Sequence, residues 1–264
     1  MRLLEVPTVT YREDEMVAYL RSVLSPLPKV KFWADEHKNV FVIKGSDAKP
    51  LPCLAAHIDS VQPLRRISVY QEDSDYLRGY LNGRQVGLGA DDKAGIHVAL
   101  QLLRRFDNIA LALFSMEESF FQGATKAAPE FFDKIGYMIE HDCPSRNMLS
   151  YTSSGMRLFD NKGDFIKTAW PVLQQHGTTL WQHHPYTDVL GIRRRFPISC
   201  LNLSCGYYNW HQRNEFVKIS DVDKAVEQGE ALVRALGDVR YPCPKDLLDD
   251  EPLCPVTPLF VPQP

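Results

Sequence analysis

The sequence predicts an α/β protein in which strands and helices alternate along the chain. Two kinds of segment support this: short apolar runs rich in β-branched residues, and longer segments whose apolar residues recur every three or four positions. Strands that alternate with helices fold into layers, with helices packed on a sheet. The 264 residues are enough for one large domain or two small ones with a substantial buried core.

Five short apolar runs predict the main strands. They cover residues 39–45, 51–57, 109–115, 135–141 and 200–207, and turn residues or polar residues bound them. Residues 62–88 are polar and rich in turn formers, so they predict a hairpin-like excursion with two short strands.

Helices are predicted where apolar residues recur at helical spacing. The first is expected over about residues 11–24, because Thr10 and Glu13 have the spacing of a capping box. Further helices are predicted over residues 92–106 and 220–237, and within 120–132, where the helix ends at Pro129 or crosses it. Residues 241–264 carry seven prolines, which predicts an extended tail after a single domain over residues 1–240.

Composition and charge restrict the class of protein. A formal net charge of −3 gives no electrostatic reason to expect nucleic acid or an acidic membrane as a partner. The N-terminal residues lack the apolar core of a signal peptide, and no apolar run approaches the roughly 20 residues of a membrane helix. Six scattered cysteines without a CxxC pair indicate free thiols in a reducing compartment, and hence the cytoplasm.

Histidines and carboxylates follow the predicted strands at the points where the strands end. His57 and Asp59 follow the strand at 51–56, Glu117 and Glu118 follow 109–115, and Asp142 follows 135–141. Asp91 and Asp92 begin a helix, and His211 comes shortly after 200–207. In open α/β sheets, ligands bind outside the carboxyl ends of the strands. We therefore expect these side chains to meet in one crevice.

Imidazole and carboxylate groups without a thiolate suit a catalytic site for Zn, with Mn or Co also possible. Two metal ions that share one bridging carboxylate need two further protein ligands each. His57 and Asp142 could complete one metal site and Glu118 and His211 the other, with Asp91 as the bridge. Asp59 would then orient the His57 ring, and Glu117 would remain as the general base.

Five segments, in order, carry a resemblance to a known family: "AAHIDSV", "GLGADDKAGI", "SMEESFFQGA", "IEHD" and "GYYNWHQRNEFVKISDV". With them the chain resembles the co-catalytic di-zinc exopeptidases, which include peptidase T-like enzymes and the leucyl and glutamyl aminopeptidase types. The resemblance implies a three-layer α/β domain with a mixed central sheet between helices. It also implies two zinc ions on His57, Asp91, Glu118, Asp142 and His211, with Asp59 behind a ligand and Glu117 as the base.

The chain departs from this family in one respect. Many relatives insert a second domain, for dimerisation or as a lid, whereas here only 68 residues separate Asp142 from His211 and 31 separate Asp59 from Asp91. We therefore expect a minimal member without that domain. The predicted function is aminopeptidase activity on short peptides. A carboxypeptidase, an amidohydrolase of N-acyl amino acids and a catalytically silent binding protein are alternatives.

Some assignments have competitors. The resemblance favours Asp91 over Asp92 as the bridge, and we expect Asp92 to cap the helix that follows. Strand alternation puts Glu140 and Asp142 on one side of the sheet, and the motif favours Asp142.

Other polar residues are candidates for supporting roles. Asp188 could reach the crevice, and one of Arg193, Arg194 and Arg195 could bind a substrate carboxylate, as a carboxypeptidase or amidohydrolase would require. For the remaining histidines, a structural role is expected for His97 and a surface loop near the mouth of the crevice for His176, His183 and His184.

Overall fold

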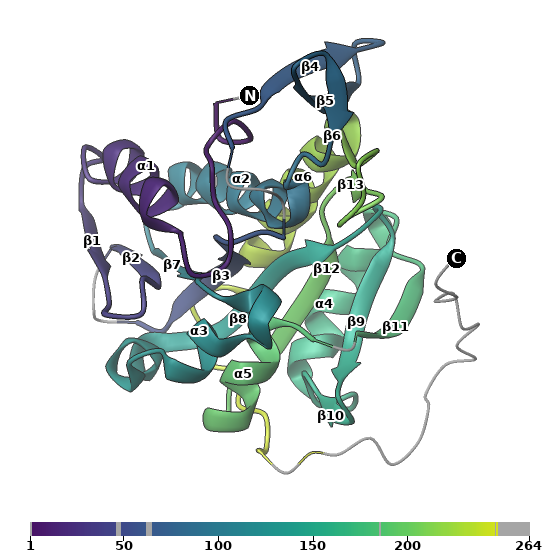
Figure 1. Ribbon diagram of the computed structural model, residues 1–264. Helices are drawn as coiled ribbons and strands as arrows, with labels where there is room; N and C mark the ends of the chain where they lie inside the picture. The colour runs from purple at the N-terminus through teal and green to yellow at the C-terminus, as the bar shows by residue number, and fades with distance from the viewer. Residues whose placement is uncertain (1, 46–48, 62–64, 185, 246, 248–264) are drawn as a thin grey trace.

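The computed structural model describes residues 2–45, 49–61, 65–184, 186–245 and 247. Its main sheet has nine strands, of which eight follow the order β1-β2-β7-β3-β8-β12-β9-β10 and β11 pairs with β9 (Figure 1). Four central strands run parallel: β7 (Ile109–Phe114), β3 (Leu51–His57), β8 (Ile135–Cys143) and β12 (Cys200–Ser204). The antiparallel strands at its sides are β1 (Val30–Ala34), β2 (Val40–Lys44), β9 (Met148–Ser153) and β10 (Met156–Arg157), and β11 (Leu180–His184) runs parallel to β9.

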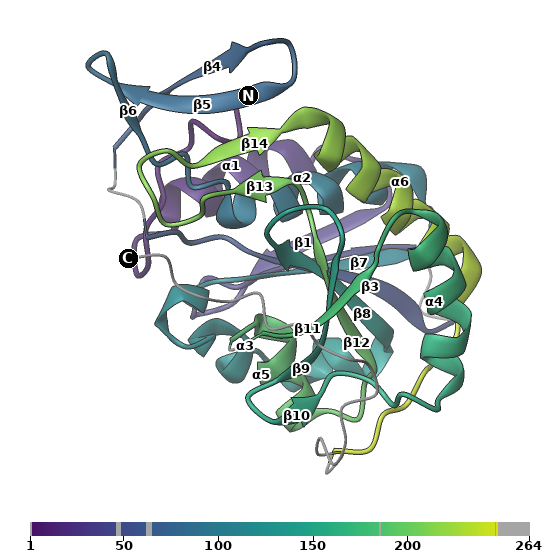
Figure 2. The ribbon, with the colours of Figure 1, turned by 90° about the vertical axis from the view of Figure 1, so that its right-hand side faces the viewer.

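Helices cover both faces of this mixed sheet (Figure 2). On one side α2 (Ala90–Arg105) packs on the central strands and on α6 (Ile219–Leu236), and α6 packs on α4 (Asp164–Gln175). Figures 1 and 2 place α1 (Asp14–Leu24) beside α2. The other side carries α3 (Gln122–Lys126) and α5 (Asp188–Arg195), which pack together. The three-layer arrangement with a mixed central sheet confirms the predicted fold class.

Burial explains the apolar character of the central strands. Every residue of β3, β7 and β8 is buried, because helices shield both faces of the sheet at this point. A strand buried on both faces has no need of alternating polar residues. The polar residues of these three segments are therefore confined to the carboxyl ends, where each strand leaves the core.

A second, smaller sheet lies beside the main one, near the N-terminus in both views. It consists of β4 (Ser68–Glu72), β5 (Tyr76–Leu81), β6 (Arg84–Val86), β13 (Tyr207–Tyr208) and β14 (Phe216–Lys218). The predicted excursion over 62–88 thus has three strands instead of two, and residues 62–64 lie outside the described part. β14 pairs with β5, which ties the loop before β14 to a segment far back in the chain.

Three local predictions were wrong in detail. The first helix begins at Asp14 without a side-chain cap, because the Thr10 hydroxyl donates instead to Asp59, at 2.9 Å. The predicted helix within 120–132 is interrupted: α3 ends at Lys126 and a 3₁₀ segment follows from Pro129 to Lys134. The predicted strand 200–207 divides into β12 and β13, with Gly206 between them at a φ of 84°.

The C-terminal segment begins with an anchored stretch. Tyr241 donates its N–H to Gly136 and accepts the N–H of Ser199, and Cys243 donates to Pro197. Beyond residue 245 only Leu247 is described, so the predicted extended tail lies almost entirely outside the described residues. Within the described part of the chain, none of the helices combines the length and apolar character needed to cross a membrane.

Arg193 fastens this segment to the domain. Its side chain is fully buried, and its guanidinium donates to the backbone carbonyls of Arg157, Phe196, Cys243 and Pro244 at 2.7–3.3 Å. The neighbouring Arg194 is exposed and lies over the Phe121 ring, 5.4 Å from its centroid. Two adjacent arginines therefore have different tasks.

We predict that Arg193→Ala lowers the free energy of unfolding by about 3 kcal/mol, because it leaves buried carbonyls without donors. Arg194→Ala is the matched control and should cost less than about 1 kcal/mol, as expected for an exposed cation–π contact. Urea unfolding followed by circular dichroism measures both. Equal losses in the two variants would show that the buried guanidinium does not anchor the segment.

Candidate metal centre

The carboxyl ends of three parallel strands bring the predicted residues together. His57 is the last residue of β3, and Asp142 is next to last in the neighbouring β8. Ala55 pairs with Glu140, so His57 and Asp142, each two residues further on, lie side by side on the same face. Glu117 and Glu118 begin the 3₁₀ turn η1 (Glu117–Ser119) just after β7.

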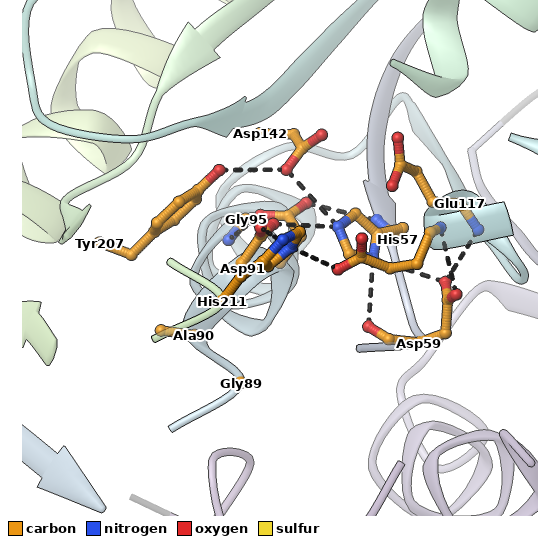
Figure 3. A network of polar contacts seen from close by, with 12 residues as sticks. His57, Asp59, Gly89, Ala90, Asp91, Gly95, Glu117, Asp142, Tyr207 and His211 are labelled. Carbon is orange, nitrogen blue, oxygen red and sulfur yellow. Dashed lines mark hydrogen bonds and ion pairs between the residues drawn. The ribbon is translucent and has the colours of Figure 1, made fainter. Parts of the chain in front are cut away.

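His57, Asp91 and Asp142 form a first group, in which both carboxylates lie near the Nε2 atom of His57. His57 Nε2 lies 3.1 Å from Asp91 Oδ1 and 3.6 Å from Asp142 Oδ1 (Figure 3). All three residues are buried. The Tyr207 hydroxyl donates to the same oxygen of Asp142 at 3.4 Å, and the Asp142 N–H donates to Asn202 at 3.0 Å.

A second group shares Asp91 with the first. His211 Nε2 lies 2.8 Å from Glu118 Oε1 and 3.2 Å from Asp91 Oδ2. The two carboxylate oxygens of Asp91 therefore face two different histidines, one in each group. The His211 side chain is 41% exposed, whereas that of His57 is 1% exposed, so the cluster opens to solvent on the His211 side.

Asp59 supports both His57 and the turn that carries the glutamates. His57 Nδ1 lies 3.1 Å from the Asp59 carbonyl oxygen and 3.5 Å from its Oδ1. The Asp59 carboxylate also accepts the N–H groups of Glu117 and Glu118, at 3.0 and 3.3 Å, and the hydroxyl of Thr10. With Nδ1 held in this way, the Nε2 lone pair is directed toward Asp91 and Asp142.

Glu117 lies beside the cluster. Its side chain is buried, and one of its oxygens comes within reach of the ligand atoms of His57 and Glu118. Burial raises the pKa of Glu117 to about 8, and the negative charges of Glu118, Asp91 and Asp59 act in the same direction. The carboxyl group is therefore suited to accept and return a proton near neutral pH.

The two competing acids have other partners. Asp92 accepts the N–H of Gly95 at 3.0 Å and that of His57 at 3.3 Å, so it caps the helix as expected. The backbone of Asp91 and Asp92 is not helical, and the peptide bond between them is cis. Glu140 accepts the Thr187 hydroxyl and the N–H of Val189, so it faces α5.

Sequence reasoning missed Glu215. It is fully buried, and its carboxylate accepts the four consecutive backbone N–H groups of residues 88–91 at 2.7–3.2 Å. Burial raises the pKa of Glu215 to about 7. The backbone N–H donors act in the opposite direction, because they stabilise the ionised carboxylate. Glu215 thereby joins the loop that carries His211 to the backbone that presents Asp91. Its place four residues after His211 was the one available signal.

The supporting candidates lie in different surroundings. Asp188 is fully buried at the start of α5, and burial together with the nearby charges of Glu140 and Glu117 raises its pKa well above the usual value. Arg193 bonds to backbone carbonyls, Arg194 lies over Phe121, and Arg195 donates to the Ala124 carbonyl at 3.0 Å. The buried contacts of Arg193 leave it unable to bind a substrate carboxylate, whereas Arg194 is exposed.

The remaining histidines also differ from expectation. His183 and His184 are the last residues of β11, so the expectation of a surface loop was wrong for this pair. His183 Nδ1 lies 2.9 Å from the Thr152 hydroxyl, and His184 Nδ1 bonds to the Tyr186 carbonyl. His176 follows the C-terminus of α4, and His97 is half-buried on α2, where burial lowers its pKa.

The donor set fits divalent cations. Burial raises the pKa of Asp142 well above its usual value, and the charges of Asp92 and Asp91 add to this, so several buried carboxylates repel one another. For His57, burial opposes protonation, but the three surrounding carboxylates still raise its pKa well above the usual value. Buried carboxylates in such numbers need compensating positive charge. Two histidines and three carboxylates, in two groups that share Asp91, match a catalytic zinc site better than a structural one.

The fold and this cluster together define a zinc-dependent hydrolase of the exopeptidase type. Residues 39–235 match the model of peptidase family M28, and the chain belongs to this family. The predicted resemblance is thereby confirmed, and with it the class of enzyme, a zinc metallopeptidase.

Solved structures show the same fold. Aminopeptidase PepT from Bacillus cereus ATCC 10987 is 15% identical, with a TM-score of 0.74 over 89% of this chain and 96% of that one. A tripeptidase from Staphylococcus aureus subsp. aureus Mu50 is 15% identical, with a TM-score of 0.75 over 88% and 95% of the two chains. An aminopeptidase from the archaeon Desulfurococcus kamchatkensis is 12% identical, with a TM-score of 0.69 over 88% and 92%. A search of curated protein sequences finds no match.

We predict that Glu215→Gln weakens zinc binding about 10- to 100-fold, the range for partners that orient metal ligands. The amide would direct an N–H₂ group at backbone donors and disturb the loop that presents Asp91. Because Asp91 belongs to both groups, metal binding to each group should be affected. Competition with a chromophoric chelator measures the affinities, and the exposed Glu36→Gln is the control. Unchanged affinity in Glu215→Gln would contradict this role.

Proposed function

We propose that the protein is an aminopeptidase that hydrolyses short peptides with two divalent metal ions, most suitably zinc. The observation that carries this proposal is the position of Asp91, whose two oxygens face His57 and His211. In the proposed centre, His57 and Asp142 would hold one ion, Glu118 and His211 would hold the other, and both would share Asp91. Asp59 acts as a positioning residue for His57.

When bound, a pair of zinc ions supplies a polarised scissile carbonyl and a water molecule of lowered pKa. Glu117 accepts the proton of the attacking water and delivers it to the nitrogen of the departing amine. Its position suits this role, because the side chain is buried and one of its oxygens lies within reach of the ligand atoms of His57 and Glu118. The N–H bonds from Glu117 and Glu118 to Asp59 hold the turn, so that the base and the ligand keep separate positions.

The contacts of Arg193 count against a carboxypeptidase or an amidohydrolase of N-acyl amino acids, and so favour the aminopeptidase. Those enzymes need a cation that binds the substrate carboxylate. The Arg193 guanidinium donates to backbone carbonyls instead. Arg195 donates one N–H to the Ala124 carbonyl, and Arg194 is exposed over the Phe121 ring. The matching structures from Bacillus cereus and Desulfurococcus kamchatkensis are described as aminopeptidases, which agrees with this choice.

We further propose a single catalytic domain over residues 1–240 and a cytoplasmic location. The stretches in which relatives insert a domain are occupied here by β4–β6 and by β9–α5. The five cysteines in the described residues are free and buried, which is consistent with a reducing compartment.

Metal content and the direction of cleavage test the function. Protein prepared without chelator should hold up to two zinc ions per chain by elemental analysis, because the cluster offers two groups of ligands. Incubated with a mixed library of short peptides, it should shorten them from the amino end, as mass spectrometry would show. If the protein takes up no divalent metal on reconstitution, the proposed metal centre is wrong. If the peptides are shortened from the carboxyl end, the aminopeptidase assignment is wrong.

The adjacent glutamates should respond differently to the same substitution. Glu117→Gln removes the proton acceptor, so hydrolysis should fall about 10²- to 10⁴-fold while both metals stay bound. Glu118→Gln replaces a carboxylate by a poorer ligand, so one metal should be lost and excess zinc should restore part of the rate. Metal stoichiometry and the rate on one tripeptide are measured for both variants.

Two results would contradict this division of roles. Loss of metal from Glu117→Gln with full retention in Glu118→Gln would exchange the two assignments. Full activity and full metal content in both variants would remove the pair from the mechanism.

A further inference from the structure

Large apolar side chains are exposed around the candidate centre. Among the described residues seven such side chains are exposed, and four of them are Tyr11, Val61, Phe120 and Tyr186. Val61 follows Asp59 by two residues and Phe120 follows Glu118 by two. The Tyr11 hydroxyl lies 2.8 Å from the Ser119 hydroxyl, within the turn that carries Glu117. A grouping of apolar side chains at one site indicates a binding surface.

Phe120 is the most exposed of the four. Its side chain is 67% exposed, and its backbone adopts a φ of 63°, in the left-handed region that bulky residues avoid. Neither feature stabilises the fold, since an exposed ring buries little apolar surface and glycine would adopt this conformation without cost. An unfavourable backbone conformation that presents an apolar ring beside a candidate base points to a role in binding.

Tyr186 completes a surface with Phe120. The two rings meet edge to face, with centroids 5.3 Å apart and planes at 86°. The Phe121 ring lies behind them, 6.2 Å from that of Tyr186. The Tyr186 carbonyl is bonded by His184, and the next residue, Thr187, is buried and donates its hydroxyl to Glu140. The Tyr186 carbonyl and the residue after it are thus held in place, and the Tyr186 ring is 44% exposed.

The position of Phe120 along the chain relates this surface to one side of the scissile bond. In the proposed function Glu117 delivers a proton to the departing nitrogen, so the leaving part of the peptide must lie over the turn Glu117–Ser119. Phe120 is the residue directly after that turn.

We propose that Phe120 and Tyr186 form a subsite for a large apolar side chain on the residue immediately after the scissile bond. The substrates would then be short peptides whose second residue is aromatic or aliphatic. The proposal rests on the proposed aminopeptidase function and specifies its substrate class. An apolar subsite of this kind discriminates by roughly 10-fold or more between a large side chain and alanine.

Three tripeptides test the subsite: Ala-Ala-Ala, Ala-Phe-Ala and Phe-Ala-Ala. For the zinc-loaded protein, kcat/KM should be about 10-fold higher for Ala-Phe-Ala than for Ala-Ala-Ala. Phe120→Gly should bring that ratio close to one. Tyr70→Ala removes another exposed ring, 57% exposed against 67% for Phe120, from β4 of the small sheet, and should keep the wild-type ratio.

Phe120→Gly also separates binding from folding. Glycine accepts the φ of 63° readily, so the melting temperature of this variant should stay at the wild-type value or rise. The proposal would be overturned if Phe120→Gly kept the wild-type ratio of kcat/KM between Ala-Phe-Ala and Ala-Ala-Ala. It would also be overturned if the substitution lowered kcat/KM for Phe-Ala-Ala and left that for Ala-Phe-Ala unchanged. If the wild-type protein cleaves none of the three peptides, the proposed function fails and this subsite fails with it.

Discussion

The position of one buried carboxylate, that of Asp91, is the constraint on which the candidate centre depends. Its two oxygens must face two histidines from opposite ends of the chain, and a small rotation of its backbone would separate the two groups. The protein holds that backbone with Glu215, whose carboxylate binds four successive N–H groups. Asp92 holds the backbone after Asp91, because its carboxylate accepts the N–H groups of Gly95 and His57. The geometry of the centre is therefore set largely by acids that are not themselves proposed ligands.

The sequence predicted the layers and the meeting of the polar residues well, because both depend on local signals. A run buried on both faces is continuously apolar, and the first ionisable side chain at its carboxyl end marks the edge of the sheet, as His57 and Glu117 do. Parallel pairing of such strands then brings their ends together. The shortened helix α3 was not predictable in this way. Phe120 and Phe121 adopt positive φ values, and Gly123 packs so closely on Ser115 that a Cβ atom would have no space.

Residues with long-range partners were the ones that the sequence could not assign. The spacing of Thr10 and Glu13 is that of a capping box, yet the Thr10 hydroxyl serves Asp59, 49 residues away. Three consecutive arginines suggested a site for a substrate carboxylate, whereas Arg193 is buried among backbone carbonyls that come together only in the folded chain. Glu215 has no local signature either, since its partners lie more than 120 residues earlier. In each case the side chain is defined by a partner that local patterns cannot supply.

The pairing of β14 with β5 has a consequence for when the protein can act. His211 reaches Glu118 across 93 residues, and Glu215 reaches the 88–91 loop across more than 120, so the cluster closes only after β13 and β14 have joined the small sheet. Contacts between such distant residues form late, because the entropy of closing the intervening chain must be overcome first. An incomplete chain emerging from the ribosome would contain His57, Asp91 and Asp142 but not yet His211. Peptidase activity is thus a property of the finished molecule and cannot begin while the chain is still being synthesised.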